Sequence, residues 1–370
     1  MRVMIAPDCF GGTLSATEVA DAVAAGWRRS RPDVELVTRP LSDGGPGFVE
    51  VLHHSLGGEL HQVPVNGPLR RTVIATWLEH DGTAYIESAQ ACGLHLVAPE
   101  DREPLTAHTV GVGEMMYDAN DFDVHTMVVG LGGTASTDGG AGLFSGLNAV
   151  PLDTRDQVLP NGGGALIDCG RIVGQVDLRD EVTIIAATDV ENPLLGEHGA
   201  ARTFGPQKGA DELTVQRLER GLAHWADIMA QACGRDVRDL PGAGAAGGLG
   251  AGLLALGARV ESGAGLVRRL TGLDEAMAGV DLVITGEGSF DWQSLRGKLA
   301  VNVAGAAAER GLPCLVLAGQ VAVGRRQAAS VGVERAYSVA EHAGSVEASL
   351  ADPAGTLAAL AADVAAQWGT

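Results

Sequence analysis

A strand followed by a helix is the pattern at both ends of this chain. Residues 2–8 are a short apolar run that Pro7-Asp8 interrupts, and Ser15-Ala16-Thr17-Glu18 has the spacing of a capping box at the start of a helix. A second strand is expected over 34–41, and a second helix from Phe48 to the glycines at 57 and 58. Two β–α units are therefore predicted at the N-terminus.

The same alternation returns near the C-terminus. Strands are expected over 280–285 and 314–318, with a helix near 295–310 between them, and shorter segments lead to a last alanine-rich helix. Two units at the start and three at the end make a five-stranded, doubly wound parallel sheet of the α/β class. We predict that residues 1–58 and 276–370 form this discontinuous domain.

The middle of the chain, residues 59–275, is predicted to be an inserted mixed α/β domain. Three alternating runs lie between 60 and 86, separated by Asn66-Gly67-Pro68 and Asp81-Gly82, which is typical of antiparallel hairpins. Several glycine-dense segments follow, the longest at 130–142 and 242–252.

Composition excludes several classes of partner. The chain of 370 residues has 26 basic and 46 acidic residues, a net charge of −20, so we expect neither nucleic acid nor an anionic membrane as a partner. No apolar run reaches ~18 residues, and the N-terminus lacks signal-peptide features, so we expect a cytoplasmic protein. Five widely spaced cysteines favour reduced thiols. An oligomeric state is left open.

Four carboxylates follow the predicted strands of the discontinuous domain. In a doubly wound sheet, ligands bind beyond the carboxyl ends of the strands, and for a flavodoxin-like strand order the site lies between the first and third strands. Asp8 ends the first strand, Asp43 follows the second, and Glu287 and Asp291 follow the third. Mg²⁺ with bound phosphates would neutralise such a group, although capping of turns remains an alternative.

Glycine-rich segments offer candidate phosphate loops, because backbone amides ahead of a helix bind anions. The segment 130–135 contains Gly132, Gly133 and Thr134 and follows an apolar strand. It also matches GxGxxA, so a nicotinamide-dependent oxidoreductase is an alternative. Segment 242–247 spells GxGxxG but follows Asp239-Leu240-Pro241 instead of a strand, and close packing of a Gly/Ala helix explains it equally well. There is no GxxxxGK[ST].

Only two of the 26 basic residues are lysines, Lys208 and Lys298, and both lie beside glycine. A compact ammonium suits a phosphate or carboxylate site in which a planar guanidinium is too large. Survival of two lysines on exposed turns is the alternative. Asp189, after the strand expected over 182–187, lies close in sequence to Asn192 and Lys208, and together these groups could orient a small hydroxy acid beside a phosphoryl group.

Motifs along nearly the whole chain resemble those of the bacterial glycerate kinase family. They are Ile5-Ala6-Pro7-Asp8, Ser42-Asp43-Gly44-Gly45, Gly130-Leu131-Gly132-Gly133, Asp138-Gly139-Gly140-Ala141-Gly142, Asn192-Pro193-Leu194-Leu195-Gly196, residues 204–210, residues 242–252 and Thr285-Gly286-Glu287-Gly288. The resemblance implies a flavodoxin-like domain with an inserted domain. It also implies ATP-dependent phosphorylation of D-glycerate, with 2-phospho-D-glycerate favoured and 3-phosphoglycerate the other product.

We therefore predict a phosphotransferase that uses ATP and D-glycerate as substrates and Mg²⁺ as cofactor. Its candidate residues fall into four groups. The catalytic group is Asp189, Lys208 and Asp8; the substrate group is Asp43, Asn192 and Lys298; the phosphate and nucleotide group is Gly132, Gly133, Thr134, Gly244, Gly247, Gly286 and Gly288; the metal group is Glu287 and Asp291.

Three positions depart from the family pattern. Gly11 replaces a usual lysine, Pro46 a usual glutamate and Ser289 a usual arginine. Losing a lysine and an arginine weakens anion binding. A non-catalytic homologue that binds a nucleotide or a carboxylate is therefore a second alternative.

Overall fold

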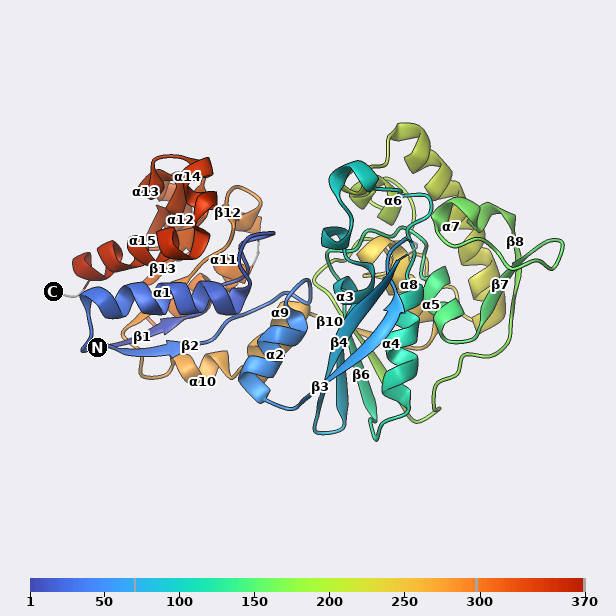
Figure 1. The fold of residues 1–370 in the computed structure, drawn as a ribbon, viewed down its shortest axis with the longest axis horizontal. Coiled ribbons are helices and arrows are strands. Elements are labelled where there is room, and N and C mark those ends of the chain that lie inside the picture. Colours follow the sequence, from blue (N-terminus) through green and yellow to red (C-terminus); the bar gives the residue numbers. More distant parts are fainter. Residues whose placement is uncertain (70, 297–298, 369–370) are drawn as a thin grey trace. The chain divides into compact units, whose positions relative to one another are not determined.

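The structure is a computed structural model that describes residues 1–69, 71–296 and 299–368. It is an α/β protein with a parallel five-stranded sheet and a separate mixed sheet (Figure 1). The chain divides into two compact units. Unit 1 comprises Met1–Ser42, Glu50–Leu56 and Val267–Thr370, and unit 2 comprises Asp43–Val49 and Gly57–Leu266. The second return to unit 1 thus falls at 267, nine residues before the position expected from the sequence.

The sheet of unit 1 has the order β15-β13-β11-β1-β2, and all its strands are parallel. Its strands are β1 (Arg2–Ile5), β2 (Glu35–Thr38), β11 (Leu282–Thr285), β13 (Cys314–Ala318) and β15 (Arg335–Ser338). Counted along the chain, this order is 2-1-3-4-5, which is one of the two common orders of doubly wound sheets. Val3 pairs with Leu282, so the two ends of the chain lie side by side in one sheet.

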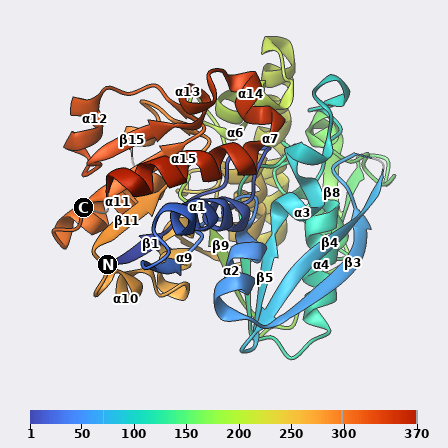
Figure 2. The same cartoon turned by 60° about the vertical axis from the view of Figure 1, so that its left-hand side comes forward.

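Two long helices of unit 1 pack closely against each other. They are α1 (Ala16–Ser30) and α15 (Pro353–Gln367), and Figure 2 shows them next to each other. The expected capping box starts α1: the Ser15 side chain accepts the Glu18 N–H, and the Glu18 carboxylate accepts the Ser15 N–H at 2.8 Å. Gly26 lies against the backbone carbonyl of Ala358, where a Cβ would collide. A glycine is therefore required at this crossing.

Shorter elements complete unit 1. They are α10 (Leu273–Met277), β12 (Ser289–Phe290), α11 (Leu299–Glu309), β14 (Gln320–Val321), α12 (Arg325–Ser330), α13 (Val339–Ala343) and α14 (Val346–Ala351), with a 3-10 turn over Ser294–Arg296. The helices α2 (Phe48–Leu56) and α9 (Gly263–Leu270) each have residues in both units. The apolar core is built from both sheet and helices and includes Val3, Ile5, Trp27 and Leu357.

The six-stranded sheet of unit 2 has the order β10-β9-β6-β5-β4-β3. Its strands are β3 (Glu59–Asn66), β4 (Thr72–His80), β5 (Thr83–Glu87), β6 (Thr126–Gly130), β9 (Thr183–Ala187) and β10 (Arg259–Glu261). The pairs β3–β4 and β4–β5 are antiparallel, which confirms the predicted hairpins. The strands β5, β6, β9 and β10 are parallel to one another, so their carboxyl ends meet at one edge.

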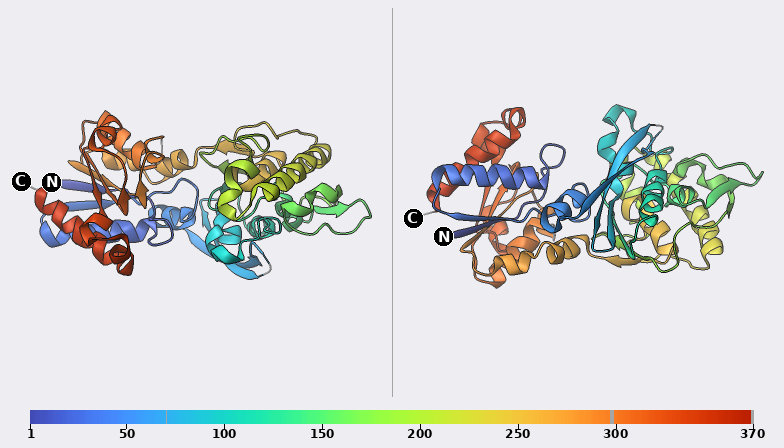
Figure 3. Two further views of the ribbon diagram at one scale, coloured as in Figure 1. Left: turned by 90° about the horizontal axis from the view of Figure 1, so that it is seen from above. Right: turned by 60° about the horizontal axis from the view of Figure 1, so that its bottom comes forward.

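The other elements of unit 2 are largely helical, and Figure 3 gives two further views of them. They are α3 (Ser88–Cys92), α4 (Val110–Asn120), α5 (Ala141–Gly146), β7 (Val150–Asp153), β8 (Cys169–Val173), α6 (Ala200–Phe204), α7 (Glu212–Cys233) and α8 (Ala245–Ala255). Short 3-10 turns lie at Leu94–Leu96, Pro99–Asp101, Gly163–Asp168 and Pro206–Lys208. No helix of the described residues has the length and apolar character needed to cross a membrane.

Three sequence-based element bounds need correction. The second strand covers only Glu35–Thr38. Beyond it, Arg39 and Leu41 each donate one backbone hydrogen bond, to Ile5 and Pro7, but they are not part of the regular strand pairing. The third strand of unit 1 begins at Leu282 instead of 280, and Asp291 follows the separate short strand β12. The helix expected from 295 begins at Leu299, after a 3-10 turn.

Candidate functional site

The carboxyl edge of the unit 2 sheet gathers most of the predicted site residues. The four parallel strands end at Glu87, Gly130, Ala187 and Glu261, and the loops that follow them form what we call the unit 2 edge. The segment 43–47 joins these loops: a Cβ on Gly132 would lie 2.7 Å from the Gly45 Cα. Such an edge of parallel strands is where open α/β sheets bind ligands.

Glu87 fixes the segment 43–47 at this edge. Its side chain is buried, and Oε2 accepts the backbone N–H groups of Gly47 at 3.1 Å and Val49 at 3.3 Å. Asp43 Oδ1 accepts the N–H of Gly45 at 3.0 Å. The carboxylate of Asp43 therefore shapes its own turn, one of the roles expected from the sequence, and also belongs to the unit 2 edge.

Asp189 lies two residues beyond the end of β9 and its side chain is exposed. The Ser262 hydroxyl donates to Oδ1 at 2.5 Å, and the Ala264 N–H donates to Oδ2 at 2.9 Å. Both carboxylate oxygens are thereby fixed by the loop after β10. Asn192 fixes the neighbouring loop through two hydrogen bonds. Its side-chain amide donates to the His198 backbone carbonyl at 2.7 Å, and its backbone carbonyl accepts the Gly244 N–H at 2.8 Å.

Lys208 is buried beneath the loop that follows β6, with only 2% of its surface exposed. Its ammonium donates to the Ser136 carbonyl and to the Thr134 hydroxyl, the latter at 3.3 Å. Burial lowers the pKa of the ammonium to about 8, and the negative charge of Asp138 opposes that shift. The structure therefore excludes an exposed turn as the environment of this lysine. Lys298 lies outside the described residues.

The second glycine segment reaches the same place. Ala246, Gly247 and Gly248 have φ angles of +52°, +70° and +89°, so left-handed residues interrupt α8 near its start. A Cβ on Gly247 would collide with the Ser136 carbonyl and lie 2.9 Å from Lys208 Nζ. The GxGxxG segment is thus closely packed, as one of its two interpretations expected. It packs against Lys208 and does not lie within a regular helix.

Asp138 is a site residue that the sequence reasoning did not select. It is fully buried and accepts hydrogen bonds from the Thr109 N–H and hydroxyl, both at 2.9 Å, and from the N–H groups of Gly140 and Gly142. It therefore holds the loop after β6 against the start of α4. The motif Asp138-Gly139-Gly140 was visible in the sequence, but its partner Thr109 is 29 residues away.

Cys92 lies beside this cluster and is fully buried. Its Sγ lies 4.0 Å from the Ser136 hydroxyl, and burial raises the pKa of the thiol to about 12. A thiol with that pKa is protonated and unreactive at neutral pH.

The carboxyl edge of the unit 1 sheet also carries carboxylates. Asp8 and Glu287 follow β1 and β11 directly, and their loops are joined because the Asp8 N–H donates to the Gly286 carbonyl at 2.8 Å. Gly288 lies against the backbone of Phe10 and Gly11. Asp291 Oδ1 caps a turn through the N–H groups of Gln293 and Ser294. Of the four carboxylates expected at one rim, these three belong to unit 1, and Asp43 belongs to unit 2.

Within the described residues, no group of three or more histidine, cysteine, aspartate or glutamate side chains is placed to hold a metal ion. Mg²⁺ is commonly held by one or two carboxylates together with substrate phosphates and water. Glu287 and Asp291 have the number and type of oxygen ligands that this second kind of site uses.

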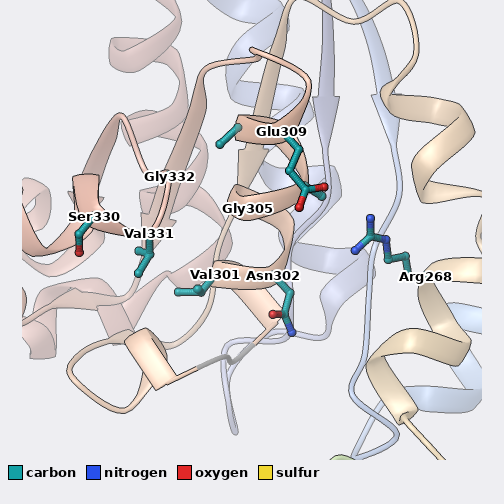
Figure 4. Close-up of a pocket in the computed structure, with 10 residues that line it drawn as sticks. Arg268, Val301, Asn302, Gly305, Glu309, Ser330, Val331 and Gly332 are labelled. Carbon is teal, nitrogen blue, oxygen red and sulfur yellow. The ribbon is translucent and has the colours of Figure 1, made fainter.

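A cavity of about 520 Å³ lies beside α11 in unit 1 (Figure 4). Asn302, Glu309 and Arg268 line it, and Arg268 is held by two hydrogen bonds of 2.7 Å to Asp274. The ion pair explains the position of this arginine without a ligand.

Fold and site together define an α/β protein of two units, in which a buried lysine and glycine loops gather at the carboxyl edge of parallel strands. The profile of the "Glycerate kinase family" matches residues 3–369. The chain belongs to the glycerate kinase family.

Its relatives include proteins of known and unknown role. The chain is 40% identical to the glycerate 2-kinase of Escherichia coli K12, over 94% of this chain and 92% of the relative. It is 47% identical to an uncharacterized protein of Mycobacterium tuberculosis, over 100% of this chain and 92% of the relative. The crystal structure of a putative glycerate kinase 2 from Salmonella typhimurium LT2 matches with a TM-score of 0.81 at 36% identity, covering 99% of this chain and 98% of that one.

Proposed function

We propose that this protein transfers the γ-phosphoryl group of ATP to the 2-hydroxyl of D-glycerate and forms 2-phospho-D-glycerate. The observations that carry the proposal are the buried Lys208 beneath the loop after β6 and the fixed carboxylate of Asp189 at the same sheet edge. Family membership and the name of the Escherichia coli relative, glycerate 2-kinase, support the reaction and the choice of hydroxyl.

Phosphate binding is proposed for the loop after β6. Backbone N–H groups of Gly132, Gly133 and Thr134 would donate to the phosphate oxygens, as in other glycine-rich anion sites. The ammonium of Lys208 supplies a positive charge directly beneath them and holds the loop in one conformation. Phosphoryl transfer depends mainly on positioning and charge neutralisation, so a preformed loop of this kind contributes to the rate.

Acceptor binding is proposed for the neighbouring loops of the unit 2 edge. Asp189 orients the reacting hydroxyl and accepts its proton, because its carboxylate is exposed and held by Ser262 and Ala264. Asp43 and Asn192 lie on adjacent loops and would contact the glycerate hydroxyl and carboxylate. Gly244 and Gly247 keep the α8 segment close to Asn192 and Lys208. Lys298 remains a proposed substrate contact.

The unit 1 edge is the proposed Mg²⁺ site. Glu287 and Asp291 would hold the ion together with the nucleotide phosphates, and Asp8, Gly286 and Gly288 would form the adjoining loops. The ion would supply charge neutralisation on the transferred phosphoryl group. In this proposal unit 1 is a flavodoxin-like domain, and the mixed α/β domain is inserted into it.

The nicotinamide alternative has less structural support. A dinucleotide fingerprint opens a helix directly, whereas the helix that follows Gly130–Ala135 begins only at Ala141. Titration of the protein with NADH, followed by nicotinamide fluorescence, tests this alternative, and we expect no saturable change.

Turnover tests both the proposed reaction and the inactive-homologue alternative. ADP release from ATP and Mg²⁺ should require D-glycerate. L-glycerate is the matched control and should give much lower turnover. ADP release that is independent of glycerate, or absent with both enantiomers, would contradict the proposed function.

A further inference from the structure

A second cavity, of about 560 Å³, lies in unit 2 and opens beside the β3–β4 turn. One wall comes from the turn and the start of β4, and the other from residues 96–103. Because β5 runs antiparallel to β4, the start of β4 lies toward the carboxyl end of β5. The cavity therefore lies at the same edge of the sheet as the proposed phosphate loop.

Direct contacts connect this cavity to the loop after β6. The Leu94 N–H donates to the Gly133 carbonyl at 2.7 Å, and Gly93 forms a β-bridge with Thr134. Val97, which lines the cavity, packs in one apolar cluster with Ala135. The cavity wall is thus separated from Thr134 by a single residue of the loop.

The lining suits a flat, largely apolar group that carries hydroxyls. Pro68, Leu69, Val73, Leu96 and Val97 provide apolar surface. Arg71, Asp101 and Glu103 lie at the same cavity and add charge. Ligand sites are commonly apolar with a few polar groups that fix orientation. Two carboxylates at the rim repel a small anion such as glycerate, but carboxylates are good acceptors for ribose hydroxyls.

Of the two rim carboxylates, Asp101 is the better candidate for such a contact. Glu103 Oε2 already accepts the Thr106 hydroxyl at 2.7 Å. The side chain of Asp101 is exposed, and within the described part of the chain it is not engaged by a hydrogen bond or an ion pair.

We propose that this cavity receives the nucleoside part of ATP, with the base against Leu69 and Val97 and the triphosphate directed toward Gly132–Thr134. The inference rests on the proposed function, because it assigns the nucleoside of that same reaction to a cavity. A nucleotide bound in this cavity would reach the loop after β6 from the side of the sheet on which β4 lies.

Filling the cavity tests the inference. Ala98 lines it and is exposed, so Ala98→Trp should occupy the space of the base without disturbing the core. We expect at least a tenfold weaker Kd for ADP by calorimetry and a similar rise in the KM for ATP, while the KM for D-glycerate stays within twofold. Val158→Trp is the matched control, since Val158 is 70% exposed and lines none of these walls, and it should change neither constant.

Hydrogen exchange provides a measurement on the unmodified protein. ADP should slow exchange of the backbone amides over 94–104, and D-glycerate alone should not. If the protein binds ADP but Ala98→Trp keeps its Kd, if both KM values rise together, or if 94–104 is not protected, the inference is wrong. If the unmodified protein neither binds ADP nor turns over, the proposed function itself fails.

Discussion

The carboxyl edges of the two sheets differ in how they treat charge. At the unit 2 edge, a buried ammonium and two buried carboxylates are each tied to backbone groups, and glycines with positive φ let the loops approach closely. At the unit 1 edge, the loops after β1 and β11 carry Asp8, Glu287 and Asp291, and the Asp291 carboxylate caps a turn through two backbone N–H groups. The difference between the edges is that the buried ammonium belongs to unit 2, which is why we propose phosphate binding there and Mg²⁺ binding at the unit 1 edge.

The unit 2 edge carries a cost in desolvation free energy, because it buries the Lys208 ammonium. An ammonium taken out of water is destabilised unless its hydrogen bonds are replaced, and Lys208 replaces them with a carbonyl and a hydroxyl of the loop it supports. The charge is therefore fixed in place before a phosphate arrives, which is the requirement for electrostatic stabilisation of a transition state. In our proposal, Mg²⁺ is the cation that interacts with Glu287 and Asp291 at the unit 1 edge.

The largest effect is expected from Asp189→Asn. The substitution keeps the size of the side chain and one of its two acceptor oxygens but removes its capacity to accept a proton, so turnover should fall by ~10²–10⁴. Steady-state kinetics measure the change, and the thermal midpoint should stay close to that of the parent. Ser262→Ala is the matched control and should lower turnover less, because it only loosens the carboxylate. An Asp189→Asn protein with nearly full turnover would remove this residue from the reaction.

The second effect is a pH dependence of stability. The pKa of Lys208 is about 8 in the folded protein and near 10.5 in the unfolded chain, so between these values the unfolded chain binds more protons. Stability should therefore rise with pH over that window, by on the order of 3 kcal/mol relative to Lys208→Met. Below pH 8 the difference between the two proteins should be constant.

Urea unfolding at several pH values measures this difference. Asp138 is the charged group that acts on the ammonium, and the neighbouring Cys92 thiol stays protonated over this window because burial raises its pKa to about 12. A difference between the two proteins that stays flat from pH 8 to 10.5 would mean that the ammonium is not desolvated as described.

A smaller effect is expected from Lys208→Arg. The guanidinium is larger than the ammonium, and a Cβ on Gly247 would already lie 2.9 Å from Nζ, so there is little free space at this end of the side chain. Overpacking should therefore cost ~1–3 kcal/mol and disturb the phosphate loop. Turnover should fall while the fold persists, as checked by circular dichroism. Arg155→Lys, at a side chain that is 84% exposed, should change stability by less than ~0.5 kcal/mol. Equal turnover and substrate affinities in Lys208→Arg and the parent would contradict a fitted cation at the unit 2 edge.

The smallest effect is expected at the unit 1 edge. Glu287→Ala or Asp291→Ala should raise the Mg²⁺ concentration needed for half-maximal turnover by about tenfold, which corresponds to ~1.4 kcal/mol per lost ligand. A titration of turnover against Mg²⁺ measures it. If both variants keep the Mg²⁺ dependence of the parent, these carboxylates have only the structural role seen in the turn after Asp291.

Local patterns were enough to predict much of the fold and part of the site. The apolar run before Asp189 predicted β9, and the hairpin turns predicted β3, β4 and β5. Lys208 stood out because lysine is so rare in this chain. These features depend on residues that are neighbours in sequence, and periodicity and turn chemistry encode such features directly.

The rest of the site depends on contacts between distant segments. Asp138 bonds to Thr109 and Glu87 to Gly47, 29 and 40 residues apart, and no periodicity links such pairs. The left-handed φ of Ala246 is equally hidden, since alanine rarely adopts it. The contact of the next residue, Gly247, with the Ser136 carbonyl joins segments more than 100 residues apart. Tertiary packing fixes these details, and a single sequence does not report it.

Phosphorus NMR of a reaction containing ATP, Mg²⁺ and D-glycerate tests the central claim most directly, because the resonances of 2-phosphoglycerate and 3-phosphoglycerate are resolved. The account predicts loss of the ATP γ-phosphate signal with matching growth of ADP and 2-phospho-D-glycerate. A spectrum in which only inorganic phosphate grows, in which 3-phosphoglycerate is the product, or in which ATP is unchanged would contradict it.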